Sequence, residues 1–138
     1  MLKVAIVGYG NLGKGVEKVL LNKDDAEIVG VFTRRDPQNV STLEATVYHM
    51  DDLLNFEDEI DVCILCGGSA TDLPVQTPEL SQYFNTVDSY DNHKLIEKHQ
   101  ENVQRKTNKT TAIVSVGWDP GIFSLQRLYI ESILGVSN

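Results

Sequence analysis

The stretch VAIVGYGNLGKG, residues 4–15, places Gly8, Gly10 and Gly13 in the spacing G-x-G-x-x-G directly after a short apolar run. The first glycine permits a tight turn, the second lets the backbone approach a pyrophosphate, and the third lets a helix pack closely on a strand. Phosphates would bind at the N-terminus of that helix, where free N–H groups and the helix dipole attract an anion. A plain glycine-rich turn is the alternative interpretation. The apolar run before the glycines and the helical pattern after them favour dinucleotide binding.

The helix expected over Asn11–Asn22 is amphipathic. Apolar residues recur at helical spacing along it, and charged residues occupy positions between them. We expect the apolar side to pack on a sheet and the charged side to face water. The apolar side consists of Leu12, Val16, Val19 and Leu20, and the charged side consists of Lys14, Glu17 and Lys18.

Short apolar runs alternate with helix-like segments along the whole chain. This alternation is typical of a parallel sheet with crossover helices. The sequence therefore predicts one α/β domain over its 138 residues, with a Rossmann-type doubly wound parallel sheet and helices on both faces. Strands are expected at Lys3–Val7, Glu27–Phe32, Thr46–Tyr48, Val62–Leu65, Thr86–Asp88 and Ala112–Val116, and helices at Asn11–Asn22, Asp51–Leu54, Thr71–Tyr83, His93–Lys106 and Ile122–Leu134.

The overall charge and the apolar pattern limit the classes of partner. Twenty Asp and Glu residues against twelve Lys and Arg give a net charge of −8, which would repel a nucleic-acid backbone. No apolar run approaches the ~20 residues that span a bilayer. The N-terminal MLKVAIVG is too short and wrongly flanked for a signal peptide. We expect a cytoplasmic protein that binds neither nucleic acid nor membrane, and no residue is assigned as a metal ligand.

The two cysteines have the spacing of a redox motif. Cys63 and Cys66 form C-x-x-C, yet both lie within the apolar run VCILC and not directly before a helix. Residues three apart in a strand point to opposite faces of the sheet. We therefore interpret the pair as buried structural thiols.

The end of the second expected strand carries the signal for cofactor choice. An NAD-binding domain has an acidic residue about twenty positions after the glycine loop, where it binds the ribose 2′-hydroxyl. This chain has Thr33, Arg34 and Arg35 there. Two guanidinium groups and a hydroxyl suit a 2′-phosphate, so NADP(H) is favoured. The alternatives are that the arginines are ordinary surface charges, or that Asp36 is the ribose acid.

Polar side chains also follow the later strands, at the edge where ligands bind in open α/β sheets. Gly67, Gly68 and Ser69 would pass close to the cofactor, although Ser69 or Thr71 could instead cap the next helix. One interpretation of Asp88 is that it only terminates its strand.

Asp91, Trp118 and Asp119 should gather where a nicotinamide would point. Acids at such a place can hold a substrate ammonium group and assist proton removal. His93 is more often a surface or capping residue than a catalyst. Pro120 and Gly121 are expected to start the last helix.

Taken together, the motifs resemble those of the meso-diaminopimelate dehydrogenase family. The likeness is carried by VAIVGYGNLG at 4–13, RR at 34–35, GSATD at 68–72, TVDSYDNH at 86–93 and GWDPG at 117–121. It covers the chain from end to end, and the last two motifs are more specific than the glycine loop. Such enzymes oxidatively deaminate the D-centre of meso-2,6-diaminopimelate to L-2-amino-6-oxopimelate with NADP+, a reaction of lysine biosynthesis.

The resemblance also implies roles for matching positions. Asp91 and Asp119 would contact the amino group of this small-molecule amino-acid substrate, and Trp118 would form a wall of its pocket. The pyrophosphate would be held by Gly10, Asn11, Leu12 and Gly13, with Gly8 at the turn. The 2′-phosphate would be held by Thr33, Arg34 and Arg35. The rest of the cofactor would be held by Cys66, Gly67, Gly68, Ser69, Ser89 and Tyr90.

Members of that family are substantially longer. The resemblance therefore implies that residues 1–138 are the NADP-binding part, that 119–138 lead into a substrate and dimerisation domain, and that the full-length protein is a homodimer. The apolar helix Ile122–Leu134 would then need another element to cover it. Two other interpretations remain: an NADP-dependent oxidoreductase acting on sugars or aldehydes, and a stand-alone nucleotide-sensing domain, which would typically keep an acid at the end of the second strand.

Overall fold

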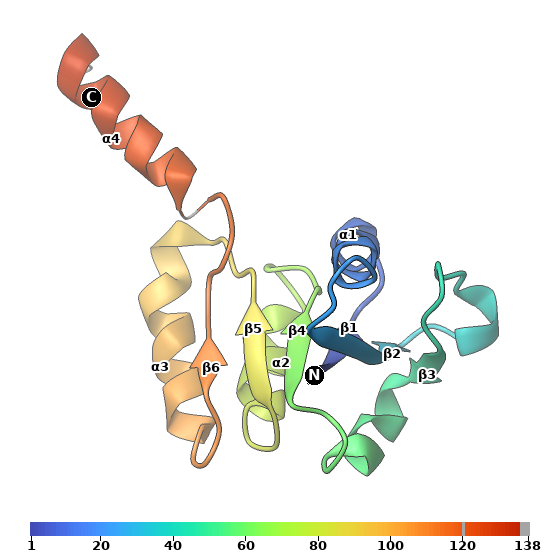
Figure 1. Ribbon diagram of the computed structural model, residues 1–138. Coiled ribbons are helices and arrows are strands. Elements are labelled where there is room, and N and C mark those ends of the chain that lie inside the picture. The colour runs from blue at the N-terminus through green and yellow to red at the C-terminus, as the bar shows by residue number, and fades with distance from the viewer. Residues whose placement is uncertain (120, 136–138) are drawn as a thin grey trace.

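The computed structural model describes residues 1–119 and 121–135 (Figure 1). Pro120, which was expected to help start the last helix, lies outside the described residues, as do residues 136–138. The elements follow the chain as β1 (Leu2–Val7), α1 (Asn11–Leu20), β2 (Ala26–Thr33), η1 (Pro37–Asn39), β3 (Val47–His49), η2 (Met50–Phe56), β4 (Val62–Leu65), α2 (Leu73–Leu80), β5 (Asn85–Asp88), η3 (His93–Leu95), α3 (Ile96–Lys106), β6 (Ala112–Ile113) and α4 (Ile122–Leu134), where η marks a 3-10 helix.

The six strands form one parallel sheet in the order β3-β2-β1-β4-β5-β6. The chain runs outward from β1 to β3 and then returns to β4 on the other side of β1. The direction of winding therefore reverses between β1 and β4, and loops at the carboxyl ends of these two strands diverge to leave a crevice. This order confirms the predicted Rossmann-type doubly wound sheet.

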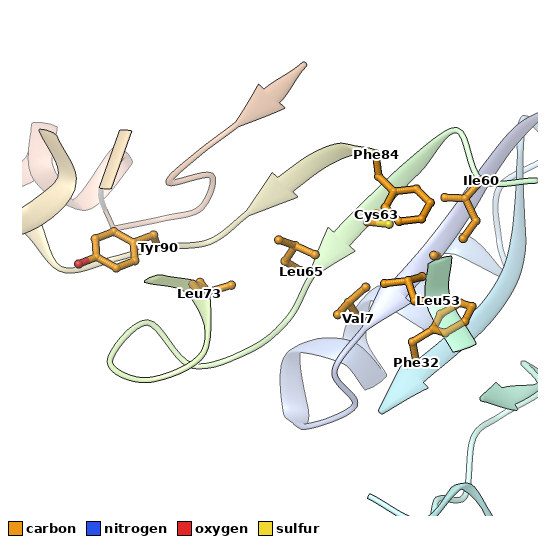
Figure 2. Close-up of a cluster of buried hydrophobic side chains, with 10 residues drawn as sticks. Val7, Phe32, Leu53, Ile60, Cys63, Leu65, Leu73, Phe84 and Tyr90 are labelled. Atoms are coloured by element: carbon orange, nitrogen blue, oxygen red, sulfur yellow. The ribbon is translucent and has the colours of Figure 1, made fainter. Parts of the chain in front are cut away.

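Both faces of the sheet are covered by buried clusters, to which β1 contributes alternately because its successive residues point to opposite sides. Ala5 and Val7 belong to a buried cluster on the side of η2, α2 and α3, and Figure 2 shows its buried side chains. Ile6 belongs to a second cluster on the side of α1. The first cluster also contains Phe32, Leu53, Ile60, Cys63, Leu65, Leu73, Phe84 and Tyr90, and the second Tyr9, Val31 and Cys66.

The sixth strand is shorter than predicted. The sequence indicated Ala112–Val116, but β6 ends at Ile113. Ser115 has a positive φ of 60°, and its N–H donates to the carboxylate of Asp88 at 2.8 Å. The strand ends early because Ser115 leaves the extended conformation and its backbone N–H bonds to the side chain of Asp88, the last residue of β5, instead of to a backbone carbonyl of that strand.

Several helices also differ from their predicted bounds. The segment predicted as Asp51–Leu54 is the longer 3-10 helix η2, and α1 and α2 are shorter than expected. The helix predicted over His93–Lys106 is divided into η3 and α3. Leu95, with φ −117° and ψ 5°, departs from helical geometry at the junction. Boundaries of this kind depend on local turns that hydrophobic periodicity does not encode.

Glu17 corrects the expectation for the charged side of α1. It was predicted to face water, but it is fully buried, whereas Val19 is 58% exposed. Its carboxylate accepts hydrogen bonds from the hydroxyl of Tyr9 and from the N–H groups of residues 43–45, the latter at 2.9–3.1 Å. Glu17 therefore joins the glycine loop to the segment before β3, a role that periodicity cannot reveal.

We expect Glu17→Gln to lower the free energy of unfolding at pH 7 by about 1–3 kcal/mol, because charge-assisted hydrogen bonds are lost. Burial would raise the pKa of Glu17, but the hydrogen bonds from Tyr9 and the three N–H groups outweigh burial and lower it. The carboxylate therefore contributes stability above the unfolded pKa, and this contribution is lost as the pH falls through the lowered folded pKa.

Urea unfolding of wild type and Glu17→Gln at pH 7 and at acid pH measures this difference. The difference in the free energy of unfolding between the two proteins should become smaller as the pH falls. Glu27→Gln, an exposed change on β2, is the matched control. An equal gap at both pH values would contradict the assignment of a buried, ionised Glu17.

The helix α4 extends away from the sheet (Figure 1), and none of its described residues is buried. The expected covering element is not among the residues that the structure describes. No helix in the described part of the chain is long and apolar enough to cross a membrane. The exposed apolar side chains of α4 are Ile122, Phe123, Leu125, Leu128, Tyr129, Ile130, Ile133 and Leu134.

Candidate functional site

A cleft of about 390 Å³ lies at the carboxyl ends of β1, β2 and β4, where the winding of the sheet reverses. This is the edge at which open α/β sheets bind their ligands. The cleft brings together the glycine loop, the arginine pair and the loop after β4, as the sequence predicted. Its lining residues are Gly8, Tyr9, Gly10, Thr33, Arg34, Arg35, Met50, Cys66, Gly67, Gly68, Asp72 and Gln76.

The three motif glycines meet different surroundings. Gly8 has a φ of +89°, which side-chain-bearing residues rarely adopt. A Cβ at Gly13 would lie 2.4 Å from the carbonyl oxygen of Gly8, so the helix and loop could not approach so closely with any other residue. A Cβ at Gly10 would have no atom within 4 Å, which leaves open space beside the loop. These are the turn, packing and ligand-approach roles expected of the motif.

The first turn of α1 is available to an anion. Gly10 occupies the N-cap position and no side chain caps the helix. The N–H groups of the first turn, including those of Asn11 and Leu12, therefore have no intrahelical carbonyl acceptor. No acidic residue lies in this turn. Backbone N–H groups and the helix dipole together favour a phosphate at this end of α1.

The end of β2 directs basic groups toward the glycine loop. Arg35 donates from Nη2 to the carbonyl oxygen of Tyr9 at 2.6 Å, and the backbone N–H of Arg35 donates to Thr33 Oγ1 at 3.1 Å. Arg34 forms an ion pair with Asp72 at 2.5 Å. Among the residues that the structure describes, Arg35 has no carboxylate partner within ion-pair distance. Arg35 is therefore the guanidinium whose charge remains available to a ligand anion.

The alternative ribose acid, Asp36, has a local structural role. Its Oδ1 accepts from the N–H of Gln38 at 3.0 Å and caps η1. The acid that does line the cleft is Asp72, which the sequence did not single out. The hydrogen bond from the N–H of Gly68 lowers the pKa of Asp72 despite partial burial, and the Arg34 guanidinium lowers it further. Asp72 thus remains ionised and holds Arg34 across the cleft.

The cysteines are free, buried thiols, as the sequence predicted. Cys63 and Cys66 belong to the two clusters on opposite faces of the sheet. Burial raises the pKa of each thiol to about 12, so neither is a thiolate at neutral pH. Cys66 also lines the cleft, where its predicted cofactor contact remains an expectation.

The loops after β4, β5 and β6 meet at the same edge. The N–H of Asp91 donates to Ser69 Oγ at 3.1 Å. Asp119 Oδ1 lies 2.8 Å from His93 Nε2 and accepts from Arg127 Nη2 at 3.0 Å. The sequence treated His93 as a surface or capping residue and did not consider Arg127. The segment after β5 therefore contacts both the loop after β4 and the loop after β6, and the gathering of Asp91, Trp118 and Asp119 at a nicotinamide stays a prediction.

Three further predicted site residues differ in their surroundings. Trp118 is 69% exposed and stacks on Phe123, with ring centroids 6.1 Å apart. Tyr90 is buried and its ring stacks on His99, with ring centroids 4.1 Å apart. Ser89 is half-buried beside it. The assigned ligand contacts of all three stay predictions.

Comparison with known proteins gives the same assignment as the motifs. Over 140 residues the chain is 52% identical to the meso-diaminopimelate D-dehydrogenase of Ureibacillus thermosphaericus, covering 99% of this chain. The chain resembles the meso-diaminopimelate dehydrogenases. This confirms the resemblance that the sequence motifs carried. The chain spans only 43% of the length of that dehydrogenase. No protein-family model matches the chain.

Solved structures of such dehydrogenases share the fold. A mutant meso-diaminopimelate dehydrogenase from Clostridium tetani E88, crystallised with DAP, matches with a TM-score of 0.83 and 48% identity, over 96% of this chain and 42% of that one. An engineered D-amino acid dehydrogenase bound to NADP+ gives a TM-score of 0.83 and 42% identity, over 96% and 41%. RSP with beta-NADH, at 14% identity and a TM-score of 0.67, shows the fold alone.

Proposed function

We propose that this chain is the NADP-binding part of a diaminopimelate dehydrogenase. The observation that carries the proposal is the position of Arg35, next to the open glycine loop and free of a carboxylate partner among the described residues. Gly10 would leave room for the pyrophosphate, Arg35 and Thr33 would bind the 2′-phosphate, and Arg34 would support them while paired with Asp72. The engineered relative bound to NADP+ supports this choice of cofactor.

The reaction proposed is oxidative deamination of the D-centre of meso-2,6-diaminopimelate to L-2-amino-6-oxopimelate, in which water would supply the carbonyl oxygen and ammonia would leave. When bound, NADP+ would supply the hydride acceptor. Asp91 and Asp119 would hold the substrate ammonium group by charge and would accept its proton, and Trp118 would exclude water from one side of the pocket. His93, at 2.8 Å from Asp119, would keep that carboxylate oriented. The Clostridium tetani structure with DAP supports this substrate class.

The relatives are more than twice as long as this chain, so we propose that a further segment completes the enzyme. That segment would bind the substrate carboxylates, cover the apolar surface of α4 and form the contacts of a homodimer. Residues 119–138 would lead into it. A biosynthetic enzyme of this kind would act in the cytoplasm.

The proposal is tested by comparing the 138-residue chain with an extended chain. The extension is the remainder of its reading frame or, if none follows, the corresponding segment of the Ureibacillus relative. We expect the extended chain to reduce NADP+ with meso-diaminopimelate but not with LL-diaminopimelate, which has no D-centre. The shorter chain should bind NADPH without turnover, since nothing positions the substrate. A folded, NADPH-binding extended chain without activity would contradict the proposal, as would ammonia-dependent NADPH oxidation by the shorter chain.

A further inference from the structure

Asp88, the last residue of β5, is a buried acid that the proposed reaction does not use. The residue is 2% exposed. Its Oδ2 accepts from Thr77 Oγ1 at 2.7 Å and lies 2.7 Å from His99 Nε2. Its Oδ1 accepts from two backbone N–H groups, those of Tyr90 at 3.1 Å and Ser115 at 2.8 Å. A strand terminator would need none of these four partners.

The two backbone donors come from different loops. Tyr90 directly precedes Asp91, whereas Ser115 begins the turn that leads to Asp119. Ser115 holds a positive φ of 60°, and the N–H of the next residue donates to the carbonyl oxygen of Asp88 at 2.9 Å. One carboxylate oxygen therefore joins the two loops that carry the proposed ammonium-binding acids.

The other oxygen fixes Asp88 to the helical layer. Thr77 lies on α2 and His99 on α3, and the His99 ring stacks on Tyr90 with an interplanar angle of 16°. Burial would raise the pKa of Asp88, but hydrogen bonds from His99, Ser115, Thr77 and Tyr90 outweigh it and lower the pKa. The group is thus a carboxylate at neutral pH, with two helices on one side and two loops on the other.

We propose that Asp88 is a positioning residue that sets the separation of Asp91 and Asp119 by binding the backbones of both their loops. The inference rests on the proposed function. Asp88 does not line the cleft between the glycine loop and the arginine pair, and of its four hydrogen-bond partners Tyr90 is the one that is also a predicted cofactor-binding residue. Loss of Asp88 should therefore impair use of the amine substrate far more than binding of NADP+.

The test compares Asp88→Ala and Asp88→Asn in the extended chain. Asparagine keeps an oxygen that can accept from both backbone N–H groups, and its amide can donate to Thr77 and to the neutral tautomer of His99. Alanine keeps no acceptor. We expect Asp88→Ala to raise the KM for meso-diaminopimelate at least ~10-fold, since each lost loop contact is of hydrogen-bond size. The Kd of Asp88→Ala for NADP+ should stay within ~3-fold of the wild-type value. Both constants of Asp88→Asn should stay near those of the wild type.

Thr77→Val is the matched control, because it removes a hydrogen bond to the same carboxylate without touching either loop. It should lower thermal stability and leave the KM within ~2-fold, as only a contact to α2 is lost. Parallel loss of NADP+ binding and substrate use in Asp88→Ala would overturn the proposal in favour of a merely structural role. So would an unchanged KM, or equal impairment of Asp88→Asn and Asp88→Ala.

Amide hydrogen exchange on the 138-residue chain tests the clamp without any activity. We expect the Tyr90 and Ser115 amides to exchange at least ~10-fold faster in Asp88→Ala than in wild type, relative to amides of β1, because their acceptor is gone. Asp88→Ser replaces Asp88→Ala if the latter fails to fold. Unchanged relative exchange would overturn the inference, whereas an inactive wild-type extended chain would refute only the proposed function.

Discussion

Arg35→Glu is expected to weaken binding of NADPH by the chain about 100-fold while changing binding of NADH less than ~3-fold. Only NADPH carries the 2′-phosphate, and a charge-assisted contact to it contributes ~1.5–3 kcal/mol, where 1.4 kcal/mol corresponds to a tenfold change. Arg35 contributes more than Arg34 because Arg34 is already paired with Asp72. Titration of intrinsic fluorescence with each nucleotide measures both constants.

The control for this substitution is Lys109→Glu. Lys109 is exposed, lies on the loop between α3 and β6, and gives the same change in net charge. It should leave both dissociation constants within ~2-fold, because distant surface charges are screened. An equal loss of NADPH affinity in Lys109→Glu would attribute the effect to overall charge, and an equal loss of NADH affinity in Arg35→Glu would attribute it to damage of the fold.

Gly10→Ala is expected to weaken NADPH binding ~10–100-fold without a measurable change in stability. A Cβ at this position meets no protein atom within 4 Å, and its φ of −91° and ψ of −155° are accessible to alanine. The methyl group would instead stand where the pyrophosphate approaches the backbone, which costs charge-assisted hydrogen bonds of ~1.5–3 kcal/mol. Thermal unfolding and calorimetric titration report the two quantities separately.

Gly15→Ala is the matched control for this substitution, because a Cβ there also meets nothing within 4 Å but lies further along α1. It should leave affinity unchanged. Gly13→Ala differs from both, since its Cβ would lie 2.4 Å from a backbone oxygen, and it should lose ~1–3 kcal/mol of stability as well as binding. Unchanged NADPH affinity in Gly10→Ala would contradict the placement of the phosphates at this loop.

The fold was predictable because its strongest signals are local. The glycine loop, the helix after it and the run of short apolar strands fix a parallel doubly wound sheet, and the observed strand order agrees. The cleft was predictable for the same reason, since strand ends in such a sheet converge at one edge. Gly8, Gly13 and Arg35 lie as their spacing indicated.

The roles of three acids, Glu17, Asp72 and Asp88, could not be predicted, because their partners are distant in sequence. Glu17 lies at a helical position where an exposed residue is expected, yet its carboxylate oxygens accept hydrogen bonds from a segment 26–28 positions away. Asp72 binds Arg34 across 38 positions, and Asp88 holds Ser115 across 27. The same contact to Asp88 shortens β6, so the error in that strand and the missed positioning residue have one cause. Periodicity reports which face is apolar, but it does not report which polar group finds a buried partner.

The dissociation constants of the unmodified chain for NADPH and NADH, measured side by side in one buffer, test the central claim most directly. The two nucleotides differ only in the 2′-phosphate that Arg35 and Thr33 are proposed to bind. We expect NADPH to bind at least ~30-fold more tightly than NADH, as one charge-assisted contact of ~2 kcal/mol requires. Equal affinities, or tighter binding of NADH as in a nucleotide-sensing domain, would contradict the assignment of this chain as the NADP-binding part of a diaminopimelate dehydrogenase.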